Sequence, residues 1–333
     1  MSARPKVAFI GTGGTIASLG AGPLDLHDYG ATGNRLHAQD LLARFPEAAL
    51  VAEVIAVRYR NVPSPAVGFA EWKELVLIAD RLTAAHPDLA GIVIGHGTAT
   101  MEETAYALQL TLKTPLPVVL TGAQRPASAL SSDAGLNLVN AIRVAASPAA
   151  RGMGVLVVLN DEIHAAREVA KTATLRLQTF RTADFGVLGQ ADGDRVAFYR
   201  RPLRRGAPDT EFDIRALDAL ARVDIAYAHA DADGVAVRAF MAAGARGIVS
   251  AGFAPGMAAP GQTEALTEAA ASGVIVVQAT RVGSGRVAQA SRLRRTGFLT
   301  ADNLTPQKAR ILLALALSVT RDPAEIARIF AEY

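Results

Sequence analysis

The sequence predicts an α/β fold in two domains, with largely parallel sheets and flanking helices. Three observations lead to this prediction. Short β-branched runs alternate with longer stretches of helical periodicity. The 333-residue chain exceeds the usual size of one domain. The alternation also restarts after a segment rich in proline, glycine and charge.

The first domain is placed at residues 1–200. Five short apolar runs are expected as strands, at residues 7–11, 51–57, 91–94, 118–121 and 155–159. Three segments between them carry apolar side chains at helical spacing, at residues 69–85, 101–112 and 133–145. Strands that alternate with helices form βαβ units, whose strands pair in parallel.

Residues 201–213 lose this periodicity and are expected to form a linker. A smaller C-terminal α/β domain follows at residues 214–333. Its expected strands are residues 223–227, 247–250 and 273–278, and its expected helices are residues 235–243 and 306–320.

Composition excludes several classes of protein. The chain has no cysteine, so thiol catalysis and thiolate metal sites are impossible. No export signal and no apolar run near the ~20 residues of a membrane span are seen, which predicts a cytoplasmic protein without a membrane partner. The net charge is +3, and the arginine clusters at residues 200–205 and 292–295 lack interleaved aromatic residues. They are interpreted as solvated loops, so no nucleic-acid partner is expected. No cofactor motif or metal cluster is visible.

The segment GTGGTIA at residues 11–17 directly follows an apolar strand. Adjacent glycines let the backbone turn sharply, and the threonines place hydroxyl groups at the carboxyl end of the strand, where α/β folds keep their sites. A dinucleotide-binding loop is the alternative. It is disfavoured because position 16 is isoleucine, which breaks the G-x-G-x-x-G spacing, and because no Gly-Lys-Ser/Thr follows.

The segment GHGTATMEETA at residues 95–105 also joins a strand to a helix. Thr100 and Glu103 have the spacing of a capping box, which any helix start can use. Thr98 lies outside that box, and backbone N–H groups at a helix start can hold a developing oxyanion. Taken alone, the segment fits a structural role and a catalytic role equally well. His96 is expected to make only a loop hydrogen bond.

Together these two segments resemble the signature motifs of the bacterial asparaginases and glutaminases. The resemblance rests on TGGTIA at residues 12–17 and HGTATMEETA at residues 96–105. It continues through TGAQRP at 121–126, ND at 160–161, KT at 171–172, SAG at 250–252 and PQKAR at 306–310. The similarity spans nearly the whole chain.

The resemblance implies an acyl-enzyme mechanism. Thr15 matches the nucleophile that attacks an amide carbonyl and expels ammonia, and Tyr29 matches the loop tyrosine that assists it. Lys171 matches the lysine behind Thr98, a role that requires a lowered pKa or an oriented water. Without the resemblance, Tyr29 is an ordinary surface tyrosine and Lys171 a solvated lysine. The substrate-binding positions implied are Ser64, Ala99 and Ala123.

Three departures concern the part of the family's site that holds the substrate's α-ammonium group. Ala99 stands where the second motif normally has aspartate, and Met257 matches a family asparagine. The family also borrows a glutamate from a neighbouring subunit, whereas residues 281–301 hold no acidic residue. Because a buried ammonium without a partner is costly, a different substrate is a simpler interpretation than one engineered or accidental replacement.

The expected function is hydrolysis of L-asparagine or a related small amide, with release of ammonia. The alternative is a catalytically weak pseudoenzyme or a ligand-binding regulator on the same fold. Retention of both threonines, Tyr29 and Lys171 favours the enzyme. The resemblance also implies a homotetramer, a dimer of dimers with sites between one subunit's N-terminal domain and its neighbour's C-terminal domain.

Overall fold

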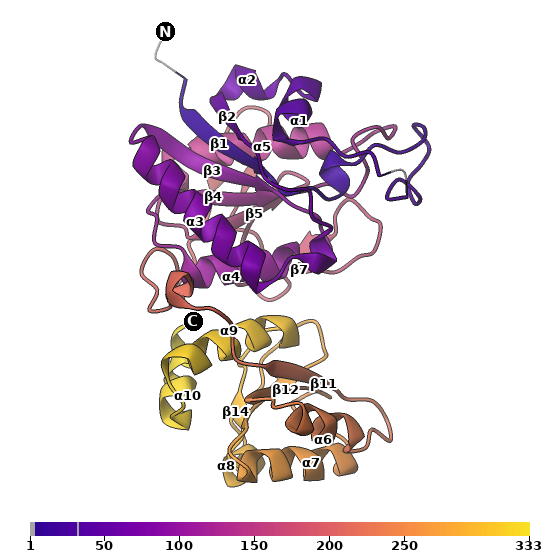
Figure 1. Cartoon of the computed structure of the whole chain (residues 1–333), viewed down its shortest axis with the longest axis vertical. Coiled ribbons are helices and arrows are strands. Elements are labelled where there is room, and N and C mark those ends of the chain that lie inside the picture. The colour runs from indigo at the N-terminus through magenta and orange to yellow at the C-terminus, as the bar shows by residue number, and fades with distance from the viewer. Residues whose placement is uncertain (1–3, 32) are drawn as a thin grey trace. The chain divides into compact units, whose positions relative to one another are not determined.

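Figure 1 shows the computed structural model of the chain, which describes residues 4–31 and 33–333. The chain divides into two compact units, one ending at Thr210 and one covering Glu211–Tyr333. Each unit has its own sheet and its own hydrophobic core. The predicted fold class, α/β with largely parallel sheets and flanking helices, is confirmed.

The first unit is built on an eight-stranded sheet with the strand order β10-β9-β6-β5-β4-β3-β1-β2. Its strands are β1 (Lys6–Gly11), β2 (Glu53–Val57), β3 (Leu89–Gly95), β4 (Val118–Thr121), β5 (Val155–Leu159), β6 (Glu162–Ala165), β9 (Gly189–Ala191) and β10 (Val196–Phe198). β1 to β5 pair in parallel, whereas β6, β9 and β10 add antiparallel strands. The carboxyl ends of the parallel strands therefore lie at one edge of the sheet, where α/β folds place their sites.

Helices cover both faces of this sheet. In Figure 1, α3 (Phe69–Ala85) and α4 (Met101–Thr111) lie in front of the strands, and α5 (Ala134–Ala146) lies behind them. α1 (Ala38–Arg44) and α2 (Ala48–Val51) pack with α5, because Leu41, Ala48 and Leu138 belong to one core cluster. The strand expected from residue 51 begins only at Glu53, since Val51 ends α2.

The second unit has a four-stranded parallel sheet in the order β11-β12-β13-β14. Its strands are β11 (Val223–Tyr227), β12 (Gly247–Gly252), β13 (Ile275–Thr280) and β14 (Leu299–Thr300). Its helices are α6 (Val235–Ala242), α7 (Pro260–Ala271), α8 (Ser291–Thr296), α9 (Pro306–Val319) and α10 (Pro323–Glu332). The sequence did not predict α7, whose buried residues are one glutamine, one leucine and two alanines and give a weak periodic signal.

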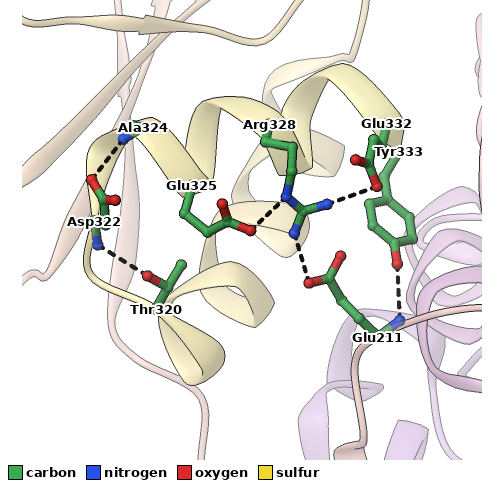
Figure 2. Close-up of polar contacts among 8 residues, drawn as sticks. All are labelled: Glu211, Thr320, Asp322, Ala324, Glu325, Arg328, Glu332 and Tyr333. Carbon is green, nitrogen blue, oxygen red and sulfur yellow. Dashed lines mark hydrogen bonds and ion pairs between the residues drawn. The ribbon is translucent and has the colours of Figure 1, made fainter.

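Figure 2 shows how α10 is joined to the first residues of the second unit. Arg328 forms ion pairs with Glu325 and Glu332 of its own helix and with Glu211, at 2.8 Å. The backbone N–H of Glu211 donates to the Tyr333 hydroxyl at 2.9 Å. The last helix of this unit therefore holds the unit's first residues in place.

Candidate active site

Two loops meet at the carboxyl edge of the first sheet, and glycine makes their contact possible. Gly13 and Gly14 follow β1 with φ angles of 105° and 83°, a region that favours glycine. A Cβ on Gly14 would lie 2.3 Å from the Cα of Gly97, and a Cβ on Gly97 would lie 2.7 Å from the Oγ of Ser64. The loops after β1 and β3 and the segment at Ser64 therefore pack with no room for a side chain at either glycine.

Thr15 begins the 3-10 helix η1 (Thr15–Ala17) directly after this glycine turn. Its Oγ1 lies 2.9 Å from the hydroxyl of Tyr29, in a hydrogen bond to which either oxygen can donate. Both residues are partly exposed, so a small ligand can reach them. The structure brings these two predicted residues together, while their catalytic roles stay predictions.

Thr98, Lys171 and Gln124 form a triangle of hydrogen bonds. The Lys171 Nζ donates to Thr98 Oγ1 at 2.8 Å and to Gln124 Oε1 at 3.2 Å. The Thr98 hydroxyl donates to the same Gln124 oxygen at 2.9 Å. Lys171 lies in β7 (Ala170–Lys171), which pairs with β8 (Phe180–Arg181), so residues 73 positions apart in the chain converge here.

The surroundings of Lys171 shift its protonation equilibrium toward the neutral amine. Burial lowers the pKa of the Lys171 ammonium from its ordinary value of 10.5, although the Glu102 carboxylate acts in the opposite direction. Glu102 is buried and accepts a hydrogen bond from the Lys171 backbone N–H at 2.7 Å. Once neutral, the amine can accept a proton from Thr98 or from a water held beside it.

Gln124 is a further residue of this cluster, and its segment, residues 121–126, carries part of the family resemblance. The side-chain amide donates to the carbonyls of Thr174 and Arg176, both at 3.2 Å, and this turns its oxygen toward Thr98. Its backbone N–H donates to the Asp133 carboxylate at 3.0 Å. The sequence signal that could have identified Gln124 as a site residue is its place shortly after β4, at the carboxyl end of a parallel strand.

The prediction that the Thr100 side chain takes part in a capping box with Glu103 is wrong. Thr100 is the N-cap residue of α4, but its side chain caps no backbone N–H. The hydroxyl instead donates to the Ser64 carbonyl at 2.6 Å. Because Ser64 begins the 3-10 helix η2 (Ser64–Ala66), this bond ties that segment to the second motif and fixes the position of Ser64.

His96 is fully buried behind the second motif and makes the loop hydrogen bond expected of it. Its Nδ1 lies 2.7 Å from the Gly97 carbonyl, and its Nε2 lies 3.1 Å from the Thr104 hydroxyl. Thr104 in turn accepts from the Trp72 indole N–H at 3.1 Å. Burial lowers the pKa of His96 to about 4, so at neutral pH the uncharged ring donates to Gly97 and accepts from Thr104.

The three predicted substrate-binding positions differ in exposure. Ala99 is exposed, directly after Thr98. Ser64 is largely buried, with its Oγ against Gly97. Ala123 is completely buried in the hydrophobic core, so its side chain cannot contact a ligand in this structure.

The other two departures from the family pattern lie in the second unit. Met257 exposes 43% of its surface. Two arginines of residues 281–301 donate to backbone carbonyls, Arg281 to Ala228 at 3.1 Å and Arg292 to Gly256 at 2.6 Å. Both guanidinium groups are thereby held against the backbone of the second unit.

Two kinds of feature are absent from residues 4–31 and 33–333. No group of three or more His, Asp or Glu residues is arranged to hold a metal ion. No helix there is both long and apolar enough to cross a membrane.

Comparison with known families matches most of the chain. Residues 6–204 match the family described as "Asparaginase, N-terminal". Residues 222–330 match the "Glutaminase/Asparaginase C-terminal domain".

Similar proteins align over nearly the whole chain. The "L-asparaginase 2" of Escherichia coli (strain K12) is 37% identical over 99% of this chain and 94% of that protein. The "Probable L-asparaginase periplasmic" of Haemophilus influenzae is 38% identical over 99% of this chain and 93% of that protein. A solved structure, the "Probable Cytoplasmic L-asparaginase from Campylobacter jejuni", has a TM-score of 0.91 at 36% identity and covers 99% of this chain and 100% of that chain.

Proposed function

This chain belongs to the bacterial asparaginase family of amide hydrolases, and we propose on that premise that Thr15 is its nucleophile and that its substrate is a small amide without an α-amino group. The observation that carries the proposal is the 2.9 Å contact between Thr15 and Tyr29, at the sheet edge that also holds Thr98 and Lys171. In this proposal, each of the two threonine hydroxyls has a hydrogen-bonded partner that can take its proton.

In the acylation step, the Thr15 Oγ1 attacks the carbonyl carbon of the amide. Its proton passes to Tyr29, which requires that the tyrosine oxygen accept at that moment, and from there toward the departing nitrogen. The C–N bond breaks, ammonia leaves, and the acyl group remains on Thr15 as an ester. Water then cleaves the ester, which releases the carboxylic acid and restores the threonine.

Thr98 and Lys171 supply the second part of the proposed mechanism. Burial of Lys171 raises the share of neutral amine, which can take a proton from Thr98 or from the attacking water. Gln124 fixes the Thr98 hydroxyl by accepting its hydrogen bond at 2.9 Å. Gln124 is thus a positioning residue, because it acts through Thr98.

The two ends of an asparagine-like substrate meet different surroundings. Ser64 is held by Thr100 at the edge of the site, which supports its proposed role with the substrate's carboxylate. Ala99 offers only a methyl group where the ammonium of asparagine would need a carboxylate. An ammonium placed there would find no carboxylate to replace the water that it gives up on binding. A carboxylic acid amide without the amino group avoids that loss.

We also propose that the enzyme is a cytoplasmic homotetramer, a dimer of dimers. Its likeness to the Campylobacter jejuni structure, named as cytoplasmic, supports the location. Light scattering tests the assembly: a monomer at micromolar concentration with full activity would contradict it.

The experiment that tests the substrate is steady-state ammonia release by the purified chain from L-asparagine and from succinamic acid, which is asparagine without its amino group. Succinamic acid should give the higher kcat/KM, because no ammonium is desolvated. A higher kcat/KM for L-asparagine would contradict the substrate proposal. The Thr15→Ala chain should be inactive on both compounds, which separates failure of the substrate from failure of the nucleophile.

A further inference from the structure

A pocket with a volume of about 710 Å³ lies in the first unit and shares no residue with the proposed catalytic set. It lies beyond the end of β2, an edge strand of the sheet, and against α3. The side chains used below are His37, Arg58, Arg60, Asn61, Glu74 and Arg81. The volume is within the range of small-molecule sites, about 300–1,000 Å³.

The charges of this pocket are unbalanced toward positive. Arg60 is shared between Glu71 at 2.8 Å and Glu74 at 3.0 Å, so the three arginines of the pocket exceed these two carboxylates by one positive charge. Arg58 and Arg81 are exposed, and neither forms a hydrogen bond or ion pair with any residue the structure describes. Two unpaired guanidinium groups at one pocket suit a ligand with two oxyanionic groups.

Two buried polar atoms of the same lining lack partners. The His37 Nδ1 and the Asn61 Oδ1 are inaccessible to solvent, and no described group hydrogen-bonds to either. An unsatisfied buried acceptor such as Asn61 Oδ1 is unfavourable unless a donor reaches it. Because these atoms are closed to solvent, a hydroxyl or amino group of a ligand would pair with Asn61 Oδ1 only after that side chain turns into the pocket.

The wall of this pocket continues into the proposed active site. A Cβ on Gly13 would lie 3.4 Å from the Asn61 Cα, and the Val62 N–H donates to the Thr12 carbonyl at 2.8 Å. Ser64 follows two residues later. A ligand that changes the position of Asn61 therefore also shifts the turn before Thr15 and shifts Ser64, the serine proposed to bind substrate.

We propose that this pocket is a regulatory site for a small molecule with two oxyanionic groups and a hydroxyl or amino donor, and that its occupation changes KM through the segment from Asn61 to Ser64. Carboxylates and phosphates both provide such oxygens. The binding half is independent of the proposed catalytic function, because no catalytic group takes part.

Isothermal titration of the full chain with three probes tests the binding half. L-malate carries two carboxylates and a hydroxyl, succinate lacks the hydroxyl, and inorganic phosphate is the alternative oxyanion. Malate or phosphate should bind more tightly than succinate. Arg58→Gln and Arg81→Gln should each weaken that binding about 10-fold to 100-fold, the effect of losing a charge-assisted hydrogen bond. Arg151→Gln, an exposed arginine elsewhere on the unit, is the matched control.

Different results would overturn the binding site and the regulatory role. Absence of binding by both malate and phosphate, equal affinity in Arg81→Gln, or equal weakening in Arg151→Gln would overturn the site. Binding should persist in Thr15→Ala, so an inactive enzyme does not obscure the result. The kinetic half requires that the bound probe change KM in the natural chain and not in Arg81→Gln. An unchanged KM would overturn the regulatory role.

Discussion

Each unit places a histidine just after a parallel strand, and the two histidines meet very different surroundings. His96 follows β3 and His229 follows β11, and each has its Nδ1 2.7 Å from the carbonyl of the next residue. His96 is completely buried, whereas His229 is exposed. The same local contact therefore belongs to a buried loop in one unit and to an exposed loop in the other.

The same contrast extends to the other loops at these strand ends. In the first unit they hold the Thr15 hydroxyl against Tyr29 and the Thr98 hydroxyl against Lys171, whose pKa is lowered by burial. In the second unit Arg281 lies over the Phe253 ring at 4.8 Å, and Met257 is exposed. The parallel sheets of the two units thus offer similar edges, but the first edge carries threonine hydroxyls hydrogen-bonded to a tyrosine and to a partly buried lysine. The predictions below test whether the chemistry resides there.

The largest expected effect is that of Thr15→Ala, which should lower kcat by about 10³-fold or more because covalent catalysis is lost. Thr15→Ser should keep part of the activity, since it retains the hydroxyl. Thr280→Ala, at the end of β13 in the second unit, is the control and should leave kcat nearly unchanged. Near-normal turnover by Thr15→Ala, measured as ammonia release, would show that the chemistry does not depend on the hydroxyl of Thr15.

The second largest expected effect is that of Lys171→Met, which removes the proposed base and should lower kcat about 10²-fold to 10⁴-fold. In the natural chain kcat/KM should rise with pH as Lys171 loses its proton, with an apparent pKa below 10.5. Gln124→Glu places a negative charge where the amide oxygen now lies 3.2 Å from Nζ. That charge raises the lysine pKa, so the profile should move to higher pH. An unmoved profile would show that Lys171 does not control it.

The two histidines should differ in their contribution to stability at acid pH. The folded chain holds His96 with a pKa of about 4 against an ordinary 6.5, so below pH 6.5 the unfolded state binds a proton that the folded state does not. Stability should therefore fall between pH 6.5 and 4, by about 3 kcal/mol at ~1.4 kcal/mol per pH unit.

Denaturant unfolding of His96→Gln and His229→Gln across this pH range checks the prediction. His96→Gln should lose that part of the pH dependence, whereas His229→Gln, with the same contact on the surface, should keep it. If the two variants behaved alike, burial of His96 would not be the cause.

The smallest expected effect comes from Ala99→Asp, which returns a carboxylate beside Thr98. It should raise kcat/KM for L-asparagine about 10-fold to 100-fold if a charge-assisted hydrogen bond of ~1.5–3 kcal/mol is recovered. The acid-free segment at residues 281–301 should hold the gain below the upper end. Succinamic acid should not benefit, because it has no ammonium. An L-asparagine kcat/KM left unchanged or lowered by the substitution would argue against a retuned site.

Local sequence patterns predicted most of the first unit. Residues 118–121 and 155–159 were predicted as the strands that became β4 and β5, because continuous β-branched runs in buried parallel strands are distinctive. The short strands β6, β9 and β10 and the helices α1 and α2 escaped prediction. Segments this short give too few periods for alternation or helical spacing to be recognised.

The same limit applies to the candidate site. Thr15 and Thr98 were found because glycine-rich turns after strands are local signals. Thr100 was misassigned, since a capping-box spacing says nothing about a carbonyl 36 positions away that competes for the hydroxyl. Gln124 was missed for a similar reason, because its role depends on carbonyls about 50 positions further along the chain.

The sequence by itself determined the α/β class, the family, and the glycines and hydroxyls at the ends of β1 and β3, because periodicity and turn chemistry are properties of neighbouring residues. Only the tertiary structure decided which side chains meet. It brings Lys171 to Thr98 across 73 positions, buries His96 while leaving His229 exposed, and leaves two arginines unpaired at the pocket beside β2. Burial and charge pairing depend on how distant βαβ units pack, and that packing is not encoded in any local pattern.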